Sequence, residues 1–307
     1  MKNTLYAVLL ICFTQASAAE KPKPLVVGES FTIHSRILNE TRRINVYQPP
    51  GHAQPGSSPL PVLYMPDGGI AEDFLHIAGL VQVSVGNQTM RPFLLVGIEN
   101  TERRRDLTGP TENANDKKIA PRVGGSELFR RFIRDELMPQ VNQRYRTTGE
   151  TAIVGESLAG LFVVESFFLE PELFDTYIAI DPSLWWNNRQ LLNVAADRLR
   201  ARPDLEKTLY FASSDEPEIV ETTQRLTELF SQNASSRIRW HYEKMPEEKH
   251  STIFHPAALK AFRSVFKVKN STDVRGQTCL PTGVCLDPAG RSLAAGNPER
   301  NACRRLN

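Results

Sequence analysis

The distribution of apolar positions along the chain predicts alternating strands and helices. Short, fully apolar runs suggest strands buried on both faces of a sheet, and apolar residues at three- and four-residue spacing suggest helices between them. N-terminal to these runs, the residues at 32–38 and 41–47 predict two strands of an antiparallel hairpin. Strands are expected at 61–65, 93–98, 151–154, 177–180, 208–212 and 237–244, and helices at 70–81, 127–138, 161–169, 218–230 and 256–266. This order predicts an α/β fold, a doubly wound and mostly parallel sheet with an N-terminal antiparallel hairpin.

The two ends of the chain differ from this pattern. Lys2, an apolar stretch at 5–13 and the small residues at 16–18 predict a signal peptide over 1–18. The stretch is too short for a membrane span, so we expect an exported protein (periplasmic or secreted) without stable membrane insertion. A catalytic domain is expected at 19–268 and a polar, Gly/Pro-rich extension at 269–307.

The mature chain would keep three cysteines, all in that extension. An oxidising compartment favours a Cys279–Cys285 bridge around a small loop. Cys303 could pair with either of them instead, and one thiol would remain. No histidine flanks them at zinc spacing, so a metal site is not expected there.

The net charge of the chain bears on which classes of binding partner are expected. The 307 residues include 37 basic and 35 acidic side chains, a net charge of +2, which gives no support to nucleic-acid binding. The length suits one large α/β domain with a substantial core. One polar segment, 101–125, is expected to form a long surface loop of the kind that is often functional.

The strongest candidate for chemistry is the hexapeptide at 155–160, which reads GESLAG between an apolar strand and an apolar helix. Small residues two positions either side of a serine allow a sharp strand-to-helix turn that exposes its hydroxyl. Ser157 is therefore the predicted nucleophile of a serine hydrolase, although Ala159 replaces the second glycine of G-x-S-x-G. The alternative is an ordinary strand–turn–helix connection.

A serine needs a base to become nucleophilic, and an acid to orient that base. Of the histidines after Ser157, His250 lies in the loop between the last strand and the last helix, where the base is expected. His255, at a helix start, is the alternative, and His241 lies within a strand. For the acid we favour Glu216, then Asp215, both after the strand at 208–212. Asp181, one strand earlier, is a further candidate.

The remaining candidates concern the oxyanion and the substrate. The backbone N–H of Leu158 and that of Gly69, after the buried strand at 61–65, are the expected oxyanion donors. Trp185 and Trp186 could wall a substrate pocket or simply be core residues. Arg105, with Arg103 and Arg104, could meet an anionic ligand or form a solvated face.

Together these motifs resemble a known family. Asp67-Gly68-Gly69, the elbow, His250, the segment 96–100 with 105–108, and the Pro182–Trp186 run are similar to the putative-esterase family of α/β hydrolases, in the branch of siderophore (enterochelin-type) esterases. The resemblance covers about 28–268. Within it, Glu156 replaces the common histidine before the serine, and Asp181 stands where the family often has serine.

The resemblance implies a serine carboxylic-ester hydrolase that works through an acyl-serine intermediate on a small-molecule ester. Siderophore lactones are the leading substrate class, and no metal or organic cofactor is implied. Other acyl or aromatic esters and acyl transfer remain alternatives within the same chemistry. A non-catalytic ligand-binding protein on the same fold is the alternative from a different class.

Overall fold

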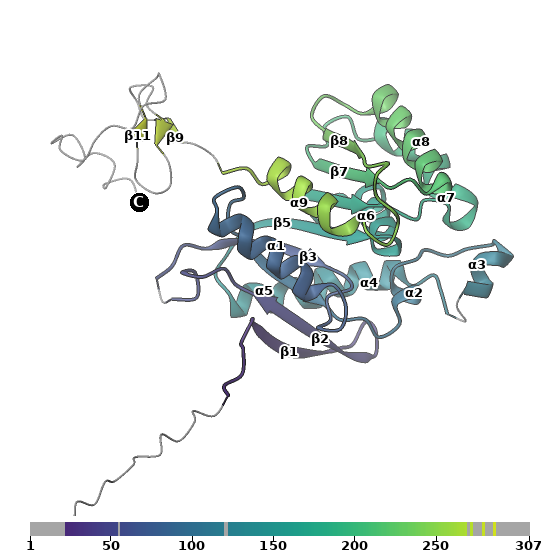
Figure 1. Ribbon diagram of the computed structural model, residues 1–307. Helices are drawn as coiled ribbons and strands as arrows, with labels where there is room; N and C mark the ends of the chain where they lie inside the picture. Colours follow the sequence, from purple (N-terminus) through teal and green to yellow (C-terminus); the bar gives the residue numbers. More distant parts are fainter. Residues whose placement is uncertain are drawn as a thin grey trace, which may run out of the picture.

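The molecule is built on one eight-stranded sheet (Figure 1). The computed structural model describes residues 22–54, 56–119 and 122–268, together with three two-residue strands near the C-terminus. The strand order is β1-β2-β4-β3-β5-β6-β7-β8. The strands are β1 (Glu29–Ser35), β2 (Glu40–Tyr47), β3 (Leu60–Met65), β4 (Leu94–Ile98), β5 (Thr147–Glu156), β6 (Thr176–Ile180), β7 (Thr208–Ser213) and β8 (Arg239–Lys244).

Strand direction confirms the predicted architecture. The first two strands form an antiparallel hairpin, and β2 also pairs antiparallel with β4. From β4 through β3, β5, β6 and β7 to β8, all neighbours are parallel. Because parallel strands end at the same edge, the loops that follow β3, β5, β6, β7 and β8 gather there.

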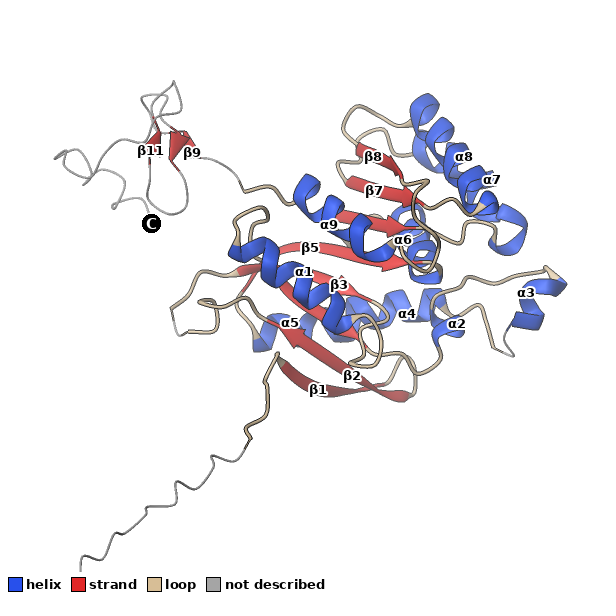
Figure 2. Ribbon diagram, viewed as in Figure 1, coloured by secondary structure: helices blue, strands red, loops and turns tan. Residues whose placement is uncertain are grey.

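Helices cover both faces of the sheet (Figure 2). One face carries α1 (Phe74–Gly86) and α9 (Phe254–Val265), which pack on each other. The other face is covered by α4 (Ser126–Phe132), a π-helical turn η1 (Ile133–Leu137), α5 (Met138–Arg144), α6 (Leu158–Leu169), α7 (Trp186–Arg200) and α8 (Pro217–Asn233). Successive side chains of a strand face opposite layers, so the central strands are apolar throughout.

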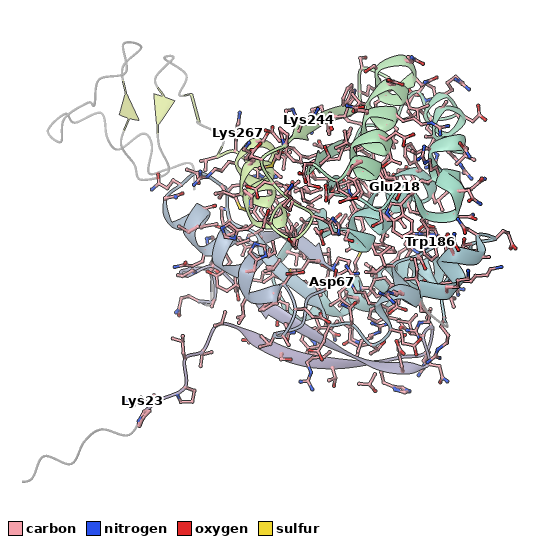
Figure 3. All side chains as sticks on the ribbon, turned by 45° about the vertical axis from the view of Figure 1, so that its right-hand side comes forward. Lys23, Asp67, Trp186, Glu218, Lys244 and Lys267 are labelled. Atoms are coloured by element: carbon pink, nitrogen blue, oxygen red, sulfur yellow. The ribbon has the colours of Figure 1, made fainter. Side chains whose placement is uncertain are left out.

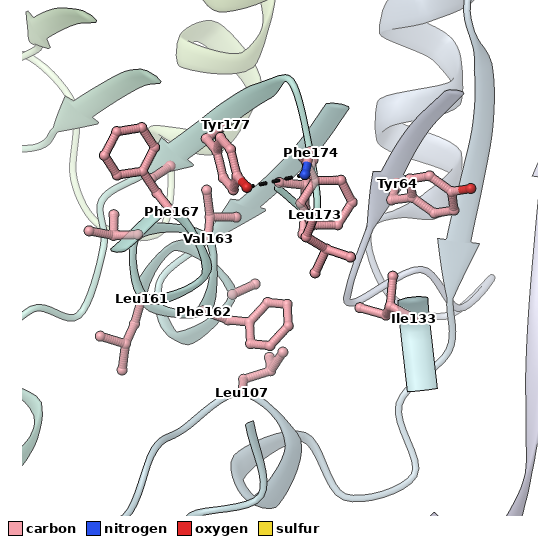
Figure 4. Close-up of a cluster of buried hydrophobic side chains, with 14 of the residues drawn as sticks. Tyr64, Leu107, Ile133, Leu161, Phe162, Val163, Phe167, Leu173, Phe174 and Tyr177 are labelled. Carbon is pink, nitrogen blue, oxygen red and sulfur yellow. Dashed lines mark hydrogen bonds between the residues drawn. The ribbon is translucent and has the colours of Figure 1, made fainter. Parts of the chain in front are cut away.

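The packing under α6 shows how these layers meet. Phe162 and Phe167 of α6 are buried with Phe174 and Tyr177 in one cluster (Figure 4). The Tyr177 hydroxyl accepts the N–H of Phe174 at 3.1 Å and donates to the carbonyl of Pro171 at 3.1 Å. A buried phenol therefore finds partners for its polar end while its ring fills the core.

Two parts of the sequence prediction were wrong. No helix was expected at α7, whose residues are mostly polar and whose first turn has Asn187, Asn188 and Arg189 at positive φ. The segment 101–125 is not simply a surface loop. It contains α2 (Arg103–Asp106) and α3 (Ala114–Ile119), and it buries Asp106 at 1% exposure, because that carboxylate pairs with the fully buried Arg42.

The boundaries of two helices also differ from the predicted ones. The α1 helix begins at Phe74 rather than at 70, and the polar turn before it follows β3. The helix predicted at 127–138 begins one residue earlier, at Ser126 of α4, whose hydroxyl donates to Glu165 of α6 at 2.9 Å. This hydroxyl therefore partners a buried carboxylate.

The C-terminal region contributes three short strands, β9 (Ser271–Thr272), β10 (Thr278–Cys279) and β11 (Cys285–Leu286). Cys279 and Cys285 stand opposite each other in the β10–β11 register. Their disulfide remains a prediction. The predicted signal peptide and Cys303 lie outside the described residues. Within the described part of the chain, no helix combines the length and apolar character needed to cross a bilayer.

Candidate active site

Ser157 lies on a strained turn between β5 and α6. Its backbone has φ 59° and ψ −118°, an uncommon conformation for a residue with a side chain. Gly155 is required on the strand side, because a Cβ there would lie 2.7 Å from the carbonyl carbon and oxygen of Ala159. On the helix side, a Cβ on Gly160 would lie 2.8 Å from the carbonyl oxygen of Ile180. Ala159 itself is fully buried, so alanine fits the place usually held by glycine.

His250 is the histidine that reaches Ser157. Its Nε2 lies 3.0 Å from the Ser157 hydroxyl oxygen, although 93 residues separate the two in the chain. The alternatives lie elsewhere: His255 stacks on His76 with centroids 4.8 Å apart, and the exposed His241 bonds to Glu243 at 3.1 Å. The geometry thus favours His250 as the partner of the serine.

The carboxylate at the other ring nitrogen is that of Asp181, not that of Glu216. Asp181 Oδ2 lies 2.6 Å from His250 Nδ1, and the residue is completely buried. Glu216 is an exposed residue at the N-terminus of α8, and Asp215 pairs with Lys249. The preference for Glu216, and after it Asp215, is therefore corrected in favour of the third candidate.

Strand register explains why Asp181 takes this place. Glu156 at the end of β5 pairs with Ile180 of β6, so Ser157 and Asp181 are the next residues on neighbouring strands. Ser214, just beyond β7, donates its backbone N–H to Asp181 Oδ1 at 2.6 Å and its hydroxyl to Oδ2 at 2.8 Å. The Asp181 carboxylate is thus fixed in orientation before it meets the imidazole.

The predicted oxyanion donors differ in their present partners. The N–H of Leu158, at the start of α6, has no acceptor among the described residues. The N–H of Gly69 donates to Glu72 Oε2 at 2.7 Å, and the N–H of Asn100 points at the same carboxylate at 3.3 Å. A carboxylate oxygen of Glu72 therefore already accepts the hydrogen bond of Gly69, one of the two expected oxyanion donors.

A network of polar contacts holds the Gly69 turn. Gly68 packs so closely on β4 that a Cβ would lie 2.3 Å from Gly97 Cα. Before it, Asp67 adopts a positive φ of 55° and accepts a bidentate pair of bonds from Arg103 at 2.7 and 2.9 Å. Figure 3 shows Asp67 and Trp186, which follow β3 and β6, well away from Lys267 beyond the end of α9.

Glu156 adds a second carboxylate beside the imidazole. Its Oε1 lies 3.4 Å from His250 Nε2, the nitrogen that also contacts Ser157. Burial raises the pKa of Glu156 to about 7, against the opposing attraction of His250 and Arg103. The hydrogen bond to Asp181, aided by the negative charge of Glu156, raises the pKa of His250.

The residues predicted to contact substrate have other partners in the structure. Trp186 is 5% exposed and its indole N–H donates to the carbonyl of Gly109 at 2.9 Å, so it anchors the neighbouring loop instead of walling a pocket. Trp185 is half-buried beside it. Arg105 bonds to Glu40 at 2.8 Å and to Asp106 at 2.7 Å, so its guanidinium is already committed.

Among the described residues, one group also has a composition that suits a metal ion. Donor atoms of Glu156, Asp181 and His250 lie within 4.8 Å of one another. However, both oxygens of Asp181 and both nitrogens of His250 take part in the hydrogen bonds given above. The arrangement is that of a hydrogen-bonded Ser–His–Asp triad, with Glu156 alongside.

The family model described as putative esterase matches residues 35–264. This is well over half of the chain, so the protein belongs to the putative-esterase family, and its sheet is that of the α/β-hydrolase fold.

Two curated relatives show how similar the chain is to individual proteins. The chain is 31% identical over 174 residues to the ferri-bacillibactin esterase BesA of Bacillus subtilis, covering 50% of this chain and 58% of that one. It is 34% identical over 161 residues to the siderophore triacetylfusarinine C esterase of Aspergillus fumigatus, covering 46% and 50%. The chain thus spans about half the length of the curated relatives it matches.

Among solved structures, an IroE-like serine hydrolase from Shewanella oneidensis is similar in fold and sequence. The TM-score is 0.71 at 28% identity, covering 78% of this chain and 80% of that one. The BES protein of Bacillus cereus has the same TM-score at 22% identity, covering 82% of this chain and all of that one, which shows the fold alone.

Proposed function

We propose that this protein is an exported serine carboxylic-ester hydrolase whose triad is Ser157, His250 and Asp181. The observation that carries the proposal is the continuous chain of hydrogen bonds from the Ser157 hydroxyl through His250 to Asp181. A buried carboxylate that holds the imidazole by Nδ1 leaves Nε2 to accept the serine proton. An adjacent base held in this way activates a serine hydroxyl near neutral pH.

The reaction follows from that geometry. Ser157 Oγ attacks the ester carbonyl while His250 Nε2 takes its proton, and the developing oxyanion is met by the N–H groups of Leu158 and Gly69. His250 then protonates the leaving alcohol, and an acyl-serine remains. Water, deprotonated by the same nitrogen, attacks the acyl group and restores Ser157. Glu72 must leave the Gly69 N–H before that donor can serve the oxyanion.

Siderophore esters are the proposed substrate class. The support is that two relatives with about a third of their aligned residues identical are named for hydrolysis of siderophore esters. Export is proposed from the charged, apolar and small-residue segments of 1–18. N-terminal sequencing of the protein recovered from its producing cells should then begin at Ala19, and a retained Met1 would contradict export.

Fluorophosphonate labelling tests the chemistry directly. The label should be found on Ser157 by peptide mass spectrometry and should be lost in Ser157→Ala and His250→Ala. Ser183 provides a matched control, because its hydroxyl lies 3.5 Å from that of Ser157 and only one of the two receives the imidazole. Ser183→Ala should still be labelled. Properly folded protein that takes up no label would instead support a ligand-binding protein.

A further inference from the structure

Glu156 places a carboxylate next to the reacting hydroxyl. Its Oε1 and the Ser157 Oγ lie 3.4 and 3.0 Å from the same ring nitrogen of His250. The Glu156 side chain is 17% exposed, whereas Asp181 on the other side of the imidazole is fully enclosed. Of the two acids beside His250, Glu156 is therefore the one that an approaching substrate can meet.

The charges that face Glu156 come from four other segments. They are His250 from the loop before α9, Arg103 of α2, Asp181 after β6 and Asp67 after β3. Arg103 is the cation of this set when His250 is neutral, and it is held by the bidentate pair with Asp67. The surroundings of the serine are thus net negative once Glu156 is ionised.

The arginines next to the site do not reverse this balance. Arg105 is engaged by Glu40 and Asp106. The guanidinium of Arg104, an exposed residue, donates to the carbonyl of Ile119. The basic run at 103–105, which suggested a place for an anionic ligand, therefore organises the loop rather than presenting an open anion site.

We propose that Glu156 determines specificity by disfavouring esters that carry negative charge near the scissile bond. A like charge at about 5 Å in a partly buried site should lower kcat/KM on the order of 10-fold to 100-fold. The inference rests on the proposed esterase function and names its substrate class. Among siderophores, the fitting ligand is an uncharged ferric tris(hydroxamate) ester, and the disfavoured one is a trianionic ferric tris(catecholate) ester.

A matched pair of substrates tests the proposal. Mono-4-nitrophenyl adipate is anionic, and its methyl ester is the neutral counterpart of the same acyl group. The ratio of kcat/KM for the neutral over the anionic ester is measured at about pH 8, where Glu156 is ionised. We expect Glu156→Gln to lower this ratio about 10-fold. Glu228→Gln, on the exposed face of α8, removes the same charge far from the triad and should leave the ratio unchanged.

The wild-type protein gives a second readout that needs no variant. The ratio should shrink at high salt and should be smaller at about pH 6 than at pH 8, since Glu156 is then protonated. Wild-type enzyme should also hydrolyse a ferric tris(hydroxamate) ester faster than a ferric tris(catecholate) ester. Hydrolysis with a ratio insensitive to salt, pH and Glu156→Gln would overturn the charge discrimination. Absence of both hydrolysis and fluorophosphonate label would instead overturn the esterase function.

Discussion

Asp181 Oδ2 lies 2.6 Å from His250 Nδ1, although the two residues are 69 positions apart in the chain. The contact joins the end of β6 to the loop before α9, and the next strand, β7, ends beside β6. Ser214 at that end donates two hydrogen bonds to the same carboxylate. The ends of two adjacent strands, β6 and β7, therefore cooperate to orient one imidazole.

The first prediction concerns this carboxylate. Asp181→Asn should lower kcat by roughly 10³- to 10⁴-fold with little change in folding, because the amide would favour the wrong imidazole tautomer. Glu216→Gln should change kcat less than about 3-fold, since Glu216 acts on His250 only through its distant charge. Steady-state kinetics on 4-nitrophenyl butyrate measure both. A larger loss in the Glu216 variant would reinstate Glu216 as the acid.

A second prediction concerns pH. The proposed mechanism needs neutral His250, and the pKa of this histidine is raised by Asp181 and by Glu156, so activity should fall as pH drops through that raised value. Removing the Glu156 charge lowers the pKa of His250. In Glu156→Gln the acidic limb of kcat/KM for a neutral ester should therefore move to lower pH. Glu228→Gln serves as the control. If the acidic limb in Glu156→Gln stays at the wild-type pH, the charge of Glu156 does not affect the pKa of His250.

The Gly69 turn provides a third prediction. Glu72 occupies the Gly69 N–H at 2.7 Å, and an oxyanion must displace it. Glu72→Ala should free the donor and raise kcat/KM for small neutral esters on the order of 10-fold, the typical value of a hydrogen bond to a charged group. Glu221→Ala, which removes an exposed carboxylate paired with Arg189, should have no such effect. A fall in activity would mean that Glu72 chiefly orders the turn.

A fourth prediction tests the tight elbow through stability. Gly155→Ala should lower the free energy of unfolding by about 1–3 kcal/mol, because its Cβ would overlap the backbone of Ala159. Gly79→Ala is the matched control: it lies within α1, where a Cβ meets nothing within 4 Å, and should stabilise by about 0.5–1 kcal/mol. Urea denaturation measures both. Equal effects in the two variants would contradict the crowding at the elbow.

Much of the fold could be predicted because its signals are local. The fully apolar strands at 61–65 and 177–180, and the turn around Ser157, are dictated by neighbours within a few residues. By contrast, no helix was predicted at α7, because it is mostly polar and its apolar stripe is limited to Leu192, Ala195 and Leu199. The burial of Asp106 depends on Arg42, which is 64 positions away.

The sequence by itself determined the alternation of strands and helices, the elbow at Ser157 and the loop that carries His250. Each depends on residue types at fixed short spacings, and short-range sterics and burial enforce them. Tertiary structure alone decided which carboxylate meets His250, and that His250 reaches both Ser157 and Glu156. Those choices depend on the register of parallel strands that are distant in the chain, and hydrogen bonds formed across that register leave no pattern along the sequence.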